Sequence, residues 1–424
     1  MARGVSLRRR EVLAAGGAIA LTAAIAACGS NTGRPSGGST GPTLSQWYHQ
    51  YGEPGVEQAV RRYANYYPRA RVRVQWRPGD YDRETATALL TDTGPDVFET
   101  DGPTIDQIRA GQVVDLSAAI GGASGDFNPI FLSTRTYQGK VYSIPQVADM
   151  QLLYYRKSML ASARIEPPRT LDALVAAARA LTTDEVKGLF LGNDGGAGAL
   201  GATPLYAAGA PLITEAGTVG FSANGVAPTL AKLHRLYSDG SLLLGAPTDW
   251  SNPSAFTQGL TAMQWSGLWV LPQITAALGD DFGVLPFPPD GSAGRPAVPV
   301  GAYGCAVNAR SPRRDLAVDY ARWLWVERLD YQRDFALSYG LHLPARLSIA
   351  SGAQRLTSGT TGEAVAFSTR YGHPAWPLLM TTRARTALQD ALTRIIQSGA
   401  DPVAELSSAI QTVEAELARV RKPV

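Results

Sequence analysis

Only two cysteines occur among the 424 residues of this sequence. Cys28 ends an apolar stretch near the amino terminus, and Cys305 lies in the apolar run Tyr303–Val307, where a small buried side chain is expected. If Cys28 carries a lipid, as argued below, no internal disulfide can form even on the oxidising side of a membrane. Histidine is also scarce. The four histidines are too far apart in sequence for the usual metal-ligand spacings: His49, His234, His342 and His373.

Several chemical motifs are missing or incomplete. No G-x-S-x-G nucleophile elbow is present, and Cys305 is expected in the core, so no catalytic residue, metal or cofactor is predicted. Gly196–Gly201 matches G-x-G-x-x-G, but a dinucleotide site also needs a helix that opens there and an acid about twenty residues further on. Pro204 interrupts this segment and the nearest acid is Glu215. Nucleotide binding is therefore kept only as a minor alternative.

The chain has no excess of charge once its first 27 residues are set aside. Those residues hold four of the 39 Lys/Arg and one of the 36 Asp/Glu, so 35 basic and 35 acidic residues remain. A nearly neutral chain has no electrostatic footprint for nucleic acid. No nucleic-acid partner is expected.

No apolar run of the amino-terminal region is long enough for a confident membrane span. Val12–Ala27 is 16 residues long and follows three arginines, Arg8–Arg10, a pattern typical of a secretory signal. We predict a signal peptide at residues 1–27. The arginines resemble a twin-arginine signal in which Arg8 replaces the usual serine, so both the Sec and the twin-arginine routes of export stay open.

The end of this run, Ile25–Cys28, resembles a bacterial lipobox, in which the Cys28 thiol takes the lipid. The alternative is an uncleaved membrane anchor. The segment after the cysteine is rich in Gly and Ser and has no apolar residue to bury, which predicts a flexible tether over residues 28–43. The protein is expected to be exported and lipid-anchored to the outer face of the cell membrane.

Strands and helices alternate after the tether. Leu44–Tyr48, Arg71–Trp76 and Val97–Glu99 are predicted strands with helical segments between them, which favours the α/β class. Ligands of such sheets lie at the carboxyl ends of the strands. Glu53 and Asp101 are therefore placed where a pocket is expected.

The segment Tyr137–Lys157 is predicted to cross between two lobes. Val141–Ile144 and Met150–Tyr155 are rich in β-branched and aromatic residues, and Pro145 is expected to interrupt the ladder between them because it has no amide hydrogen. Asp149 on this crossing is expected to point into the crevice. Two further crossings are predicted at 285–301 and 341–346. The predicted organisation is lobe 1 at 44–146 and 299–342, lobe 2 at 147–298, and a helical region at 343–424 packed mainly on lobe 2.

Helix signals are clear in the second half of the chain. Thr170 and Asp401 are expected N-caps, and helices are predicted at 203–217, 222–239 and from Leu316 to about Tyr331. The last helix carries an apolar stripe with alternating steps of three and four residues from Val403 to Val420, as in a coiled-coil seam. We predict that this stripe packs on its own lobe and that the protein is a monomer.

Aromatic and carboxylate side chains gather at predicted strand ends and loops. A pyranose ring packs its C–H face on an aromatic surface, while Asp and Glu accept hydroxyls and Arg donates paired hydrogen bonds. These residues indicate sugar recognition, although core packing, helix capping and surface ion pairs are the alternatives for each one. The candidate ligand-binding residues are Trp47, Glu53, Asp101, Asp149, Asn193, Trp265, Trp269, Tyr303, Arg346 and Trp376.

Five loose motifs in a fixed order resemble the extracellular solute-binding proteins of family 1, the carbohydrate receptors of ABC importers. The motifs are Gly94–Val97, Gly139–Pro145 with Asp149 and Tyr154–Lys157, Ala262–Trp269, Pro299–Gly304 and Leu343–Arg346. The resemblance implies a periplasmic-binding-protein-like fold of two α/β lobes with hinge crossings, a sugar ligand and ABC permease partners.

Individual positions follow from this resemblance. It implies that Trp269 is the stacking tryptophan, that Asp149 is the acidic hinge residue and that Trp376 lies near a second aromatic platform. The segment around Thr100 lacks the aromatic residue of maltose binders, and Tyr303 stands where relatives have Trp, so the identity of the sugar stays open. A receptor for a glycerophosphodiester or another polar solute is the alternative. A secreted glycoside hydrolase, with an acid–base carboxylate pair, is the alternative from another class.

Overall fold

The computed structural model describes residues 41–422. The predicted signal peptide, Cys28 and all but the last three residues of the tether lie outside these residues. A ten-stranded mixed sheet organises the described chain, with the main order β2-β1-β3-β10-β6-β8-β7. The strands are β1 (Thr43–His49), β2 (Arg71–Arg77), β3 (Val97–Thr100), β6 (Ile144–Arg156), β7 (Lys187–Phe190), β8 (Thr261–Gly267), β9 (Phe282–Leu285), β10 (Val298–Val307), β11 (Leu343–Pro344) and β12 (Gly372–Pro374), with β4 (Thr136–Tyr137) and β5 (Lys140–Val141) forming a separate hairpin.

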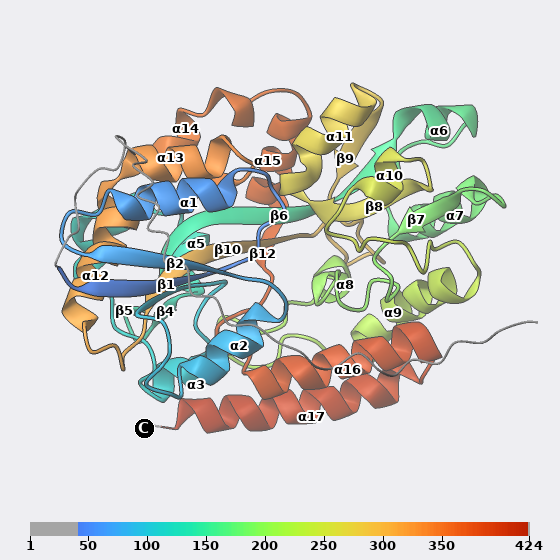
Figure 1. The fold of residues 1–424 in the computed structure, drawn as a ribbon. Coiled ribbons are helices and arrows are strands. Elements are labelled where there is room, and N and C mark those ends of the chain that lie inside the picture. Colours follow the sequence, from blue (N-terminus) through green and yellow to red (C-terminus); the bar gives the residue numbers. More distant parts are fainter. Residues whose placement is uncertain (1–40, 423–424) are drawn as a thin grey trace, which may run out of the picture. The chain divides into compact units, whose positions relative to one another are not determined.

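Strand β6 runs without a break through both halves of the sheet (Figure 1). Its first part pairs with β10 and its last part with β8 and β9. The chain passes here from one half of the sheet to the other, and the ladder is irregular beside Pro145 as expected, but the strand itself continues. Pro145 pairs with Gly304, and the next residue of β6, Gln146, is an extra residue that shifts the register with β10; a proline without an amide hydrogen is tolerated at such an irregularity.

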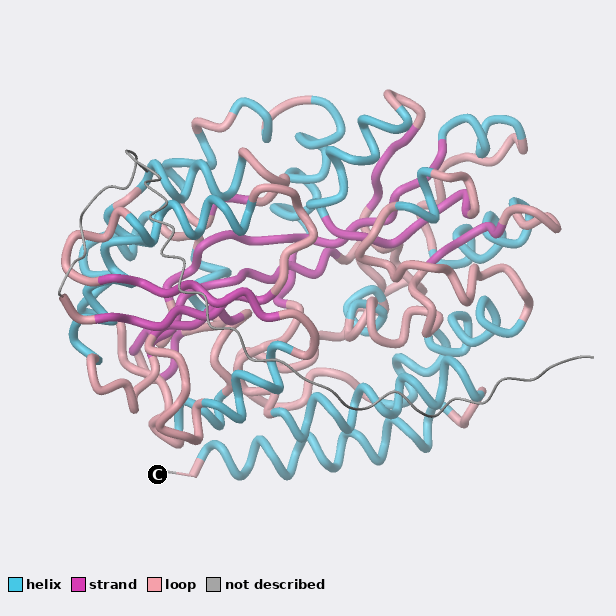
Figure 2. The backbone as a smooth tube through the Cα atoms, viewed as in Figure 1, coloured by secondary structure: helices cyan, strands magenta, loops and turns pink. Residues whose placement is uncertain are grey.

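Two hydrophobic cores lie on either side of this crossing. The first includes Leu44, Val97 and Trp325, and the second includes Leu189 and Trp265. Figure 2 shows the strands running through the middle of the molecule with helices on both sides. The longer helices are α1 (Val56–Asn65), α2 (Tyr81–Ala88), α7 (Leu171–Leu181), α9 (Ala223–Ser238), α11 (Leu271–Leu278), α12 (Arg314–Arg322), α13 (Leu329–Leu337), α15 (Gly359–Tyr371), α16 (Thr382–Ser398) and α17 (Pro402–Arg421).

Short helices fill the connections between these elements. In Figure 1, α1 and α13 lie on one side of the sheet in the first lobe, and α2 and α3 lie on the other side. The short helices are α3 (Ile105–Arg109), α4 (Ser117–Ile120), α5 (Pro129–Ser133), α6 (Lys157–Ser162), α8 (Thr203–Ala207), α10 (Ser254–Thr257) and α14 (Leu347–Ser351).

Some predicted helices keep their bounds and others do not. The caps at Thr170 and Asp401 are confirmed, because their side chains accept hydrogen bonds from the amides of Ala173 and Ala404. The helix predicted over 203–217 is wrong after its first turn. It ends at Ala207 because Gly209 takes a left-handed conformation with φ of 85°, which stops a helix.

The helix predicted from Leu316 to Tyr331 is in fact two helices. A π-helical stretch, η3 (Trp323–Glu327), follows α12, and Arg328 then leaves the helical region with φ of −90° and ψ of 74°. The helix α13 begins at the next residue. The side chain of Trp325 in the π-helical stretch is fully buried in the first core.

The apolar stripe of the last helix is buried within the chain except at its first residue, Val403, which is exposed. Leu406, Val413 and Leu417 lie in the second core, where α17 packs against α16 and α9. The segment before α16 and α17 packs on the other core, since Leu356 and Ala364 belong to the first core.

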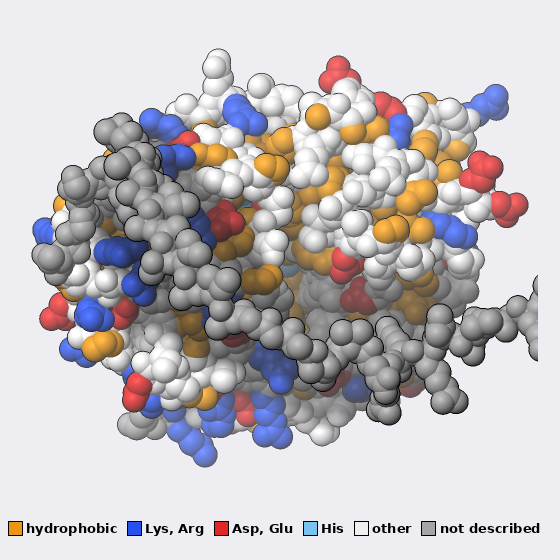
Figure 3. All heavy atoms as spheres, in the orientation of Figure 1, with side chains coloured by type: hydrophobic (Ala, Val, Ile, Leu, Met, Phe, Trp, Pro, Cys, Tyr) orange, Lys and Arg blue, Asp and Glu red, His pale blue; other side chains and the backbone are white. Residues whose placement is uncertain are grey.

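Within residues 41–422, no helix is both long and apolar enough to span a membrane. Charged side chains of both signs are interspersed on the face shown in Figure 3.

Candidate functional site

A hollow of about 400 Å³ lies beside β6, where segments of both lobes meet. We call it the central pocket. It brings together four of the residues expected from the sequence, Glu53, Asp149, Trp269 and Tyr303, which come from four separate segments. The lining residues used below are His49, Tyr51, Glu53, Asp149, Trp250, Asn252, Trp269, Tyr303 and His342.

Trp269 is positioned by the glycine that precedes its turn. It lies in the short 3₁₀ turn η2 (Leu268–Val270) after β8, and its ring folds back over the backbone of Gly267. The indole Nε1 donates to the carbonyl of Ser251 at 3.0 Å, and the Trp250 ring meets it edge-on at 5.7 Å. The two half-buried indoles provide the kind of apolar aromatic surface that small-molecule pockets use for ring-shaped ligands.

His342 joins two carboxylates at one side of the pocket. Its Nδ1 lies 2.6 Å from Asp149 Oδ1 on β6, and its Nε2 lies 3.2 Å from Glu53 Oε1 in the loop after β1. Burial disfavours charge on the imidazole, but the two carboxylates outweigh it and raise the pKa of His342 to about 10. Burial alone would raise the pKa of Glu53, but the contact with His342 lowers it. The contact with His342 therefore favours the ionised form of Glu53 and holds both acids in place.

A second carboxylate–histidine pair lies on the opposite side of Tyr51. The buried Glu99 receives His49 Nδ1 at 2.6 Å and the Tyr51 hydroxyl at 2.5 Å. Burial opposes charge on His49, but Glu99 raises its pKa above the ordinary value. The His49 ring stacks on Tyr303 at 4.5 Å. These contacts fix the aromatic wall that the first lobe presents to the pocket.

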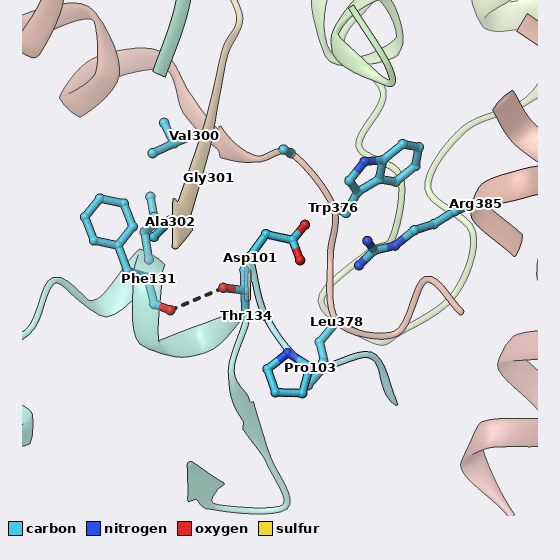
Figure 4. A pocket seen from close by; sticks show the side chains of 13 residues that line it. Asp101, Pro103, Phe131, Thr134, Val300, Gly301, Ala302, Trp376, Leu378 and Arg385 are labelled. Carbon is cyan, nitrogen blue, oxygen red and sulfur yellow. Dashed lines mark hydrogen bonds between the residues drawn. The ribbon is translucent and has the colours of Figure 1, made fainter. Parts of the chain in front are cut away.

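Asp101 lies just past the carboxyl end of β3 and lines two neighbouring hollows, of about 50 and 560 Å³. Figure 4 shows its carboxylate pointing toward the side of the smaller hollow where Trp376 and Arg385 lie. The Arg385 guanidinium lies 5.4 Å from the centre of the Trp376 ring, and burial lowers its pKa. Asp82 lines the larger hollow, and burial together with the charge of Asp101 raises its pKa to about 6.

These hollows and the central pocket share an electrostatic environment. Burial raises the pKa of Tyr303 well above its ordinary value, and the charges of Asp101 and Asp82 add to this effect. Asp101 and Trp376, both expected from the sequence, therefore line a hollow separate from the central pocket, although the charge of Asp101 acts on Tyr303 in that pocket.

Four predicted site residues line none of these hollows. Trp265 lies inside β8, is fully buried and donates its indole N–H to Gln151 at 2.9 Å, so it is a core residue. Trp47 is buried in a small core, with the Arg77 guanidinium 3.9 Å from its ring. Both tryptophans were expected at strand ends, but β1 and β8 continue past them, and both rings are buried.

Arg346 and Asn193 make local structural contacts instead. Arg346 Nε donates to Asp126 at 2.7 Å, and its guanidinium lies over Phe127. Asn193 exchanges two hydrogen bonds with the backbone of Ala246 and so holds a loop.

The sequence interpretation missed several lining residues. His49 and His342 were considered only as metal ligands, although His342 lies within the crossing predicted at 341–346. Trp250 and Asn252 lie in a polar loop with no periodic pattern, and Arg385 lies on a helix with none of the family motifs. Among residues 41–422, no group of three or more His, Cys, Asp or Glu side chains is arranged to hold a metal ion.

Residues 53–325 match the model of the family described as bacterial extracellular solute-binding protein. The chain belongs to this family. The solute-binding protein also resembles solved structures of low sequence identity. An ABC transporter solute-binding protein from Thermotoga lettingae, bound with alpha-D-tagatose, has a TM-score of 0.75 at 21% identity over 89% of this chain and 100% of the other.

Two further structures have the same fold. The GacH receptor of Streptomyces glaucescens, solved with acarbose, has a TM-score of 0.72 at 21% identity, with 89% of this chain and 99% of the other covered. The cyclic alpha-maltosyl-1,6-maltose binding protein of Arthrobacter globiformis has a TM-score of 0.66 at 20% identity, covering 89% and 100% of the two chains. The predicted two-lobed α/β fold is confirmed.

Proposed function

We propose that this solute-binding protein is the receptor of an ABC importer and captures a carbohydrate between its two lobes. The central pocket carries the proposal, because it combines the indoles of Trp250 and Trp269 from one lobe with Glu53 and Tyr303 from the other. Aromatic faces pack on the C–H faces of sugars, and carboxylates accept their hydroxyls. The sugars named with the three related structures support the same ligand class.

Roles within the site follow from the geometry. Trp269 is the stacking surface for one ring, with Trp250 beside it. Asp149 and Glu53 accept hydroxyls of that ring. Asp101 and Trp376 serve a second ring of a longer ligand, since they combine a carboxylate with an aromatic ring beside one hollow. No residue is assigned a catalytic role, and we propose that the protein is not an enzyme.

The remaining parts of the function concern location and partners. We propose that Cys28 is the lipidated amino terminus and anchors the protein at the outer face of the cell membrane. Closure of the lobes around the ligand is then the signal that the permease subunits read. The protein is proposed to act as a monomer, which sedimentation of the lipid-free chain measures directly.

A thermal-shift screen tests the ligand class, because a ligand that binds only the folded state raises the melting temperature. The panel contains tagatose, maltose, mannobiose, xylobiose and chitobiose, with glycerophosphocholine as the phosphodiester and acarbose as a basic oligosaccharide. We expect one or more sugars to raise the melting temperature and to be recovered intact. A rise with glycerophosphocholine alone identifies the alternative receptor, and released monosaccharide identifies a hydrolase.

A matched pair of variants ties the ligand to the central pocket. Trp269→Ala removes the proposed stacking surface, whereas Trp323→Ala removes an indole that packs on Tyr67 and Tyr320 in the first lobe. The sugar-dependent shift should be lost in the first variant and kept in the second. Equal shifts in both variants would place the sugar elsewhere.

A further inference from the structure

His342 faces a carboxylate oxygen at each of its two ring nitrogens. Nδ1 lies 2.6 Å from Asp149, and Nε2 lies 3.2 Å from Glu53. A neutral imidazole has one N–H, so one nitrogen would present its lone pair to a carboxylate. Only the imidazolium donates to both acids. The two distances therefore favour a protonated ring between two carboxylates and set its orientation.

Two histidines can place positive charge near these acids: His342 contacts both directly, and His49 acts on Glu53 at longer range. Among residues 41–422, His342 is the only basic side chain within ion-pair distance of Glu53 or Asp149. The His342 side chain is 3% exposed, whereas the Asp149 side chain is 16% exposed and lines the pocket. The other titratable group packed on the ring is Tyr51, whose ring meets it edge-on at 6.3 Å. An uncompensated pair of buried acids would be costly.

The three side chains come from three segments that meet at the crossing. Glu53 belongs to the loop after β1, Asp149 lies in the middle of β6, and His342 immediately precedes β11, which pairs with β6. The histidine thus holds one acid of the first lobe against one acid of the crossing strand. The histidine therefore sets the positions of both carboxylates before a ligand binds.

We propose that protonated His342 is the positioning residue of the central pocket: it fixes Glu53 and Asp149 as hydroxyl acceptors and cancels one of their two charges, so that the pocket selects neutral sugars over amino sugars. The inference rests on the proposed sugar-binding function. Two ionised acids without this histidine would attract an ammonium group strongly. With it, the trio carries a single negative charge and its acceptors are already ordered for hydroxyls.

Three charge states of the trio test the proposal. Glu53→Gln gives a trio with no net charge, the native protein has one negative charge, and His342→Asn has two while its amide keeps the position of Nδ1 toward Asp149. The probes are chitobiose, which is neutral, and its de-N-acetylated form, which is cationic, together with glucose and glucosamine. Calorimetric titration gives the ratio of the affinities for the cationic and the neutral member of each pair.

We expect this ratio to rise in the order Glu53→Gln, native, His342→Asn, by about tenfold per charge in a partly solvated pocket. A purely structural role for the histidine would weaken both members of a pair together and leave the ratio unchanged. His234→Asn is the control, since His234 contacts the carbonyl of Ile396 away from the pocket, and its ratio should equal that of the native protein. A ratio that does not follow the charge order overturns the proposal.

A second measurement needs no ligand. The side-chain ¹⁵N resonances of His342, assigned by their loss in His342→Asn, should show an imidazolium throughout the range of about pH 5–8, in which an ordinary histidine loses its proton. A neutral tautomer at pH 7 overturns the proposal even if His342→Asn fails to fold. If neither these probes nor any sugar of the thermal-shift panel binds the native protein, the proposed sugar-binding function fails, and the selectivity fails with it. Binding with an unordered ratio overturns only the role of His342.

Discussion

The ring of Trp269 occupies the space in which a side chain at Gly267 would begin. A Cβ atom at position 267 would lie 1.9 Å from the indole carbons, far inside van der Waals contact. The stacking surface of the central pocket thus depends on the absence of a single methyl group at the end of β8.

We expect Gly267→Ala to displace the Trp269 indole and to weaken sugar binding by at least about tenfold, the order expected for losing an aromatic anchor. The cost in stability should be about 1–3 kcal/mol, as for overpacked sites. Calorimetric titration and urea unfolding measure the two effects. Gly279→Ala is a control for replacing a glycine in the same lobe, because a Cβ there meets no atom within 4 Å, although its positive φ adds some strain. Native affinity in Gly267→Ala would contradict the placement of the site.

Removing the indole itself should have a comparable effect on binding and a smaller one on stability. Trp269→Ala is expected to weaken binding by about 1–3 kcal/mol while the melting temperature stays close to native, because the half-buried ring lies on the pocket wall. Trp323→Ala should leave binding unchanged, since its ring packs on Tyr67 and Tyr320 and does not line the central pocket. Both variants are to be titrated with the sugar that gives the largest thermal shift.

The charge of His342 should appear in the pH dependence of stability. Its pKa in the folded protein is about 10, above the value of about 6.5 in an unfolded chain. The stabilisation is therefore complete below about pH 6.5 and is lost as the pH rises toward 10. The difference in free energy of unfolding between native protein and His342→Asn should shrink across this window in urea titrations. A difference that stays constant with pH would mean that the ring is not charged.

Ligand binding should close the two lobes. A ligand that touches Trp269 in one lobe and Glu53 in the other favours the closed state by its differential affinity. Small-angle scattering should show a smaller radius of gyration at saturation with the sugar identified in the screen. The Trp269→Ala protein should need at least about ten times more sugar for the same compaction. Unchanged scattering at saturation would rule out closure as the signal.

The proposed anchor makes a separate prediction. Cys28→Ala removes the thiol that takes the lipid, so the protein should be released from the membrane or processed abnormally. Fractionation of cells and mass spectrometry of the mature terminus measure these outcomes. Cys305→Ala is the matched control, since Cys305 is buried in the first core. Normal membrane retention and an unchanged mature terminus in Cys28→Ala would show that the lipobox interpretation is wrong.

The fold was predictable because its signals are local and periodic. Alternating apolar residues marked the strands, and the caps at Thr170 and Asp401 lay where their side chains predicted. The crossing at β6 was identified, but not its continuity, because a one-residue bulge at Gln146 lets the strand continue past Pro145, and the pairing with β10 that holds it comes from a segment about 150 residues away.

The site was predictable only in part, because some of its contacts join segments that are far apart in the sequence. Trp269 and Asp149 belong to motifs, whereas the partnership of His342 with Glu53 arises only when two distant segments meet. Trp265 illustrates the opposite error, since burial within β8 depends on how far the strand extends and on what packs over it. Residue type alone does not distinguish a pocket wall from a core.

The continuity of β6 has a mechanical consequence. Because the strand keeps its hydrogen bonds to β10 at one end and to β8 and β9 at the other, the lobes are joined by a hydrogen-bonded strand and not by a flexible linker. Bending this strand during closure costs elastic energy. Part of the free energy of sugar binding in the proposed mechanism therefore goes into deforming β6. This energy is regained when the lobes reopen and the sugar passes to the permease.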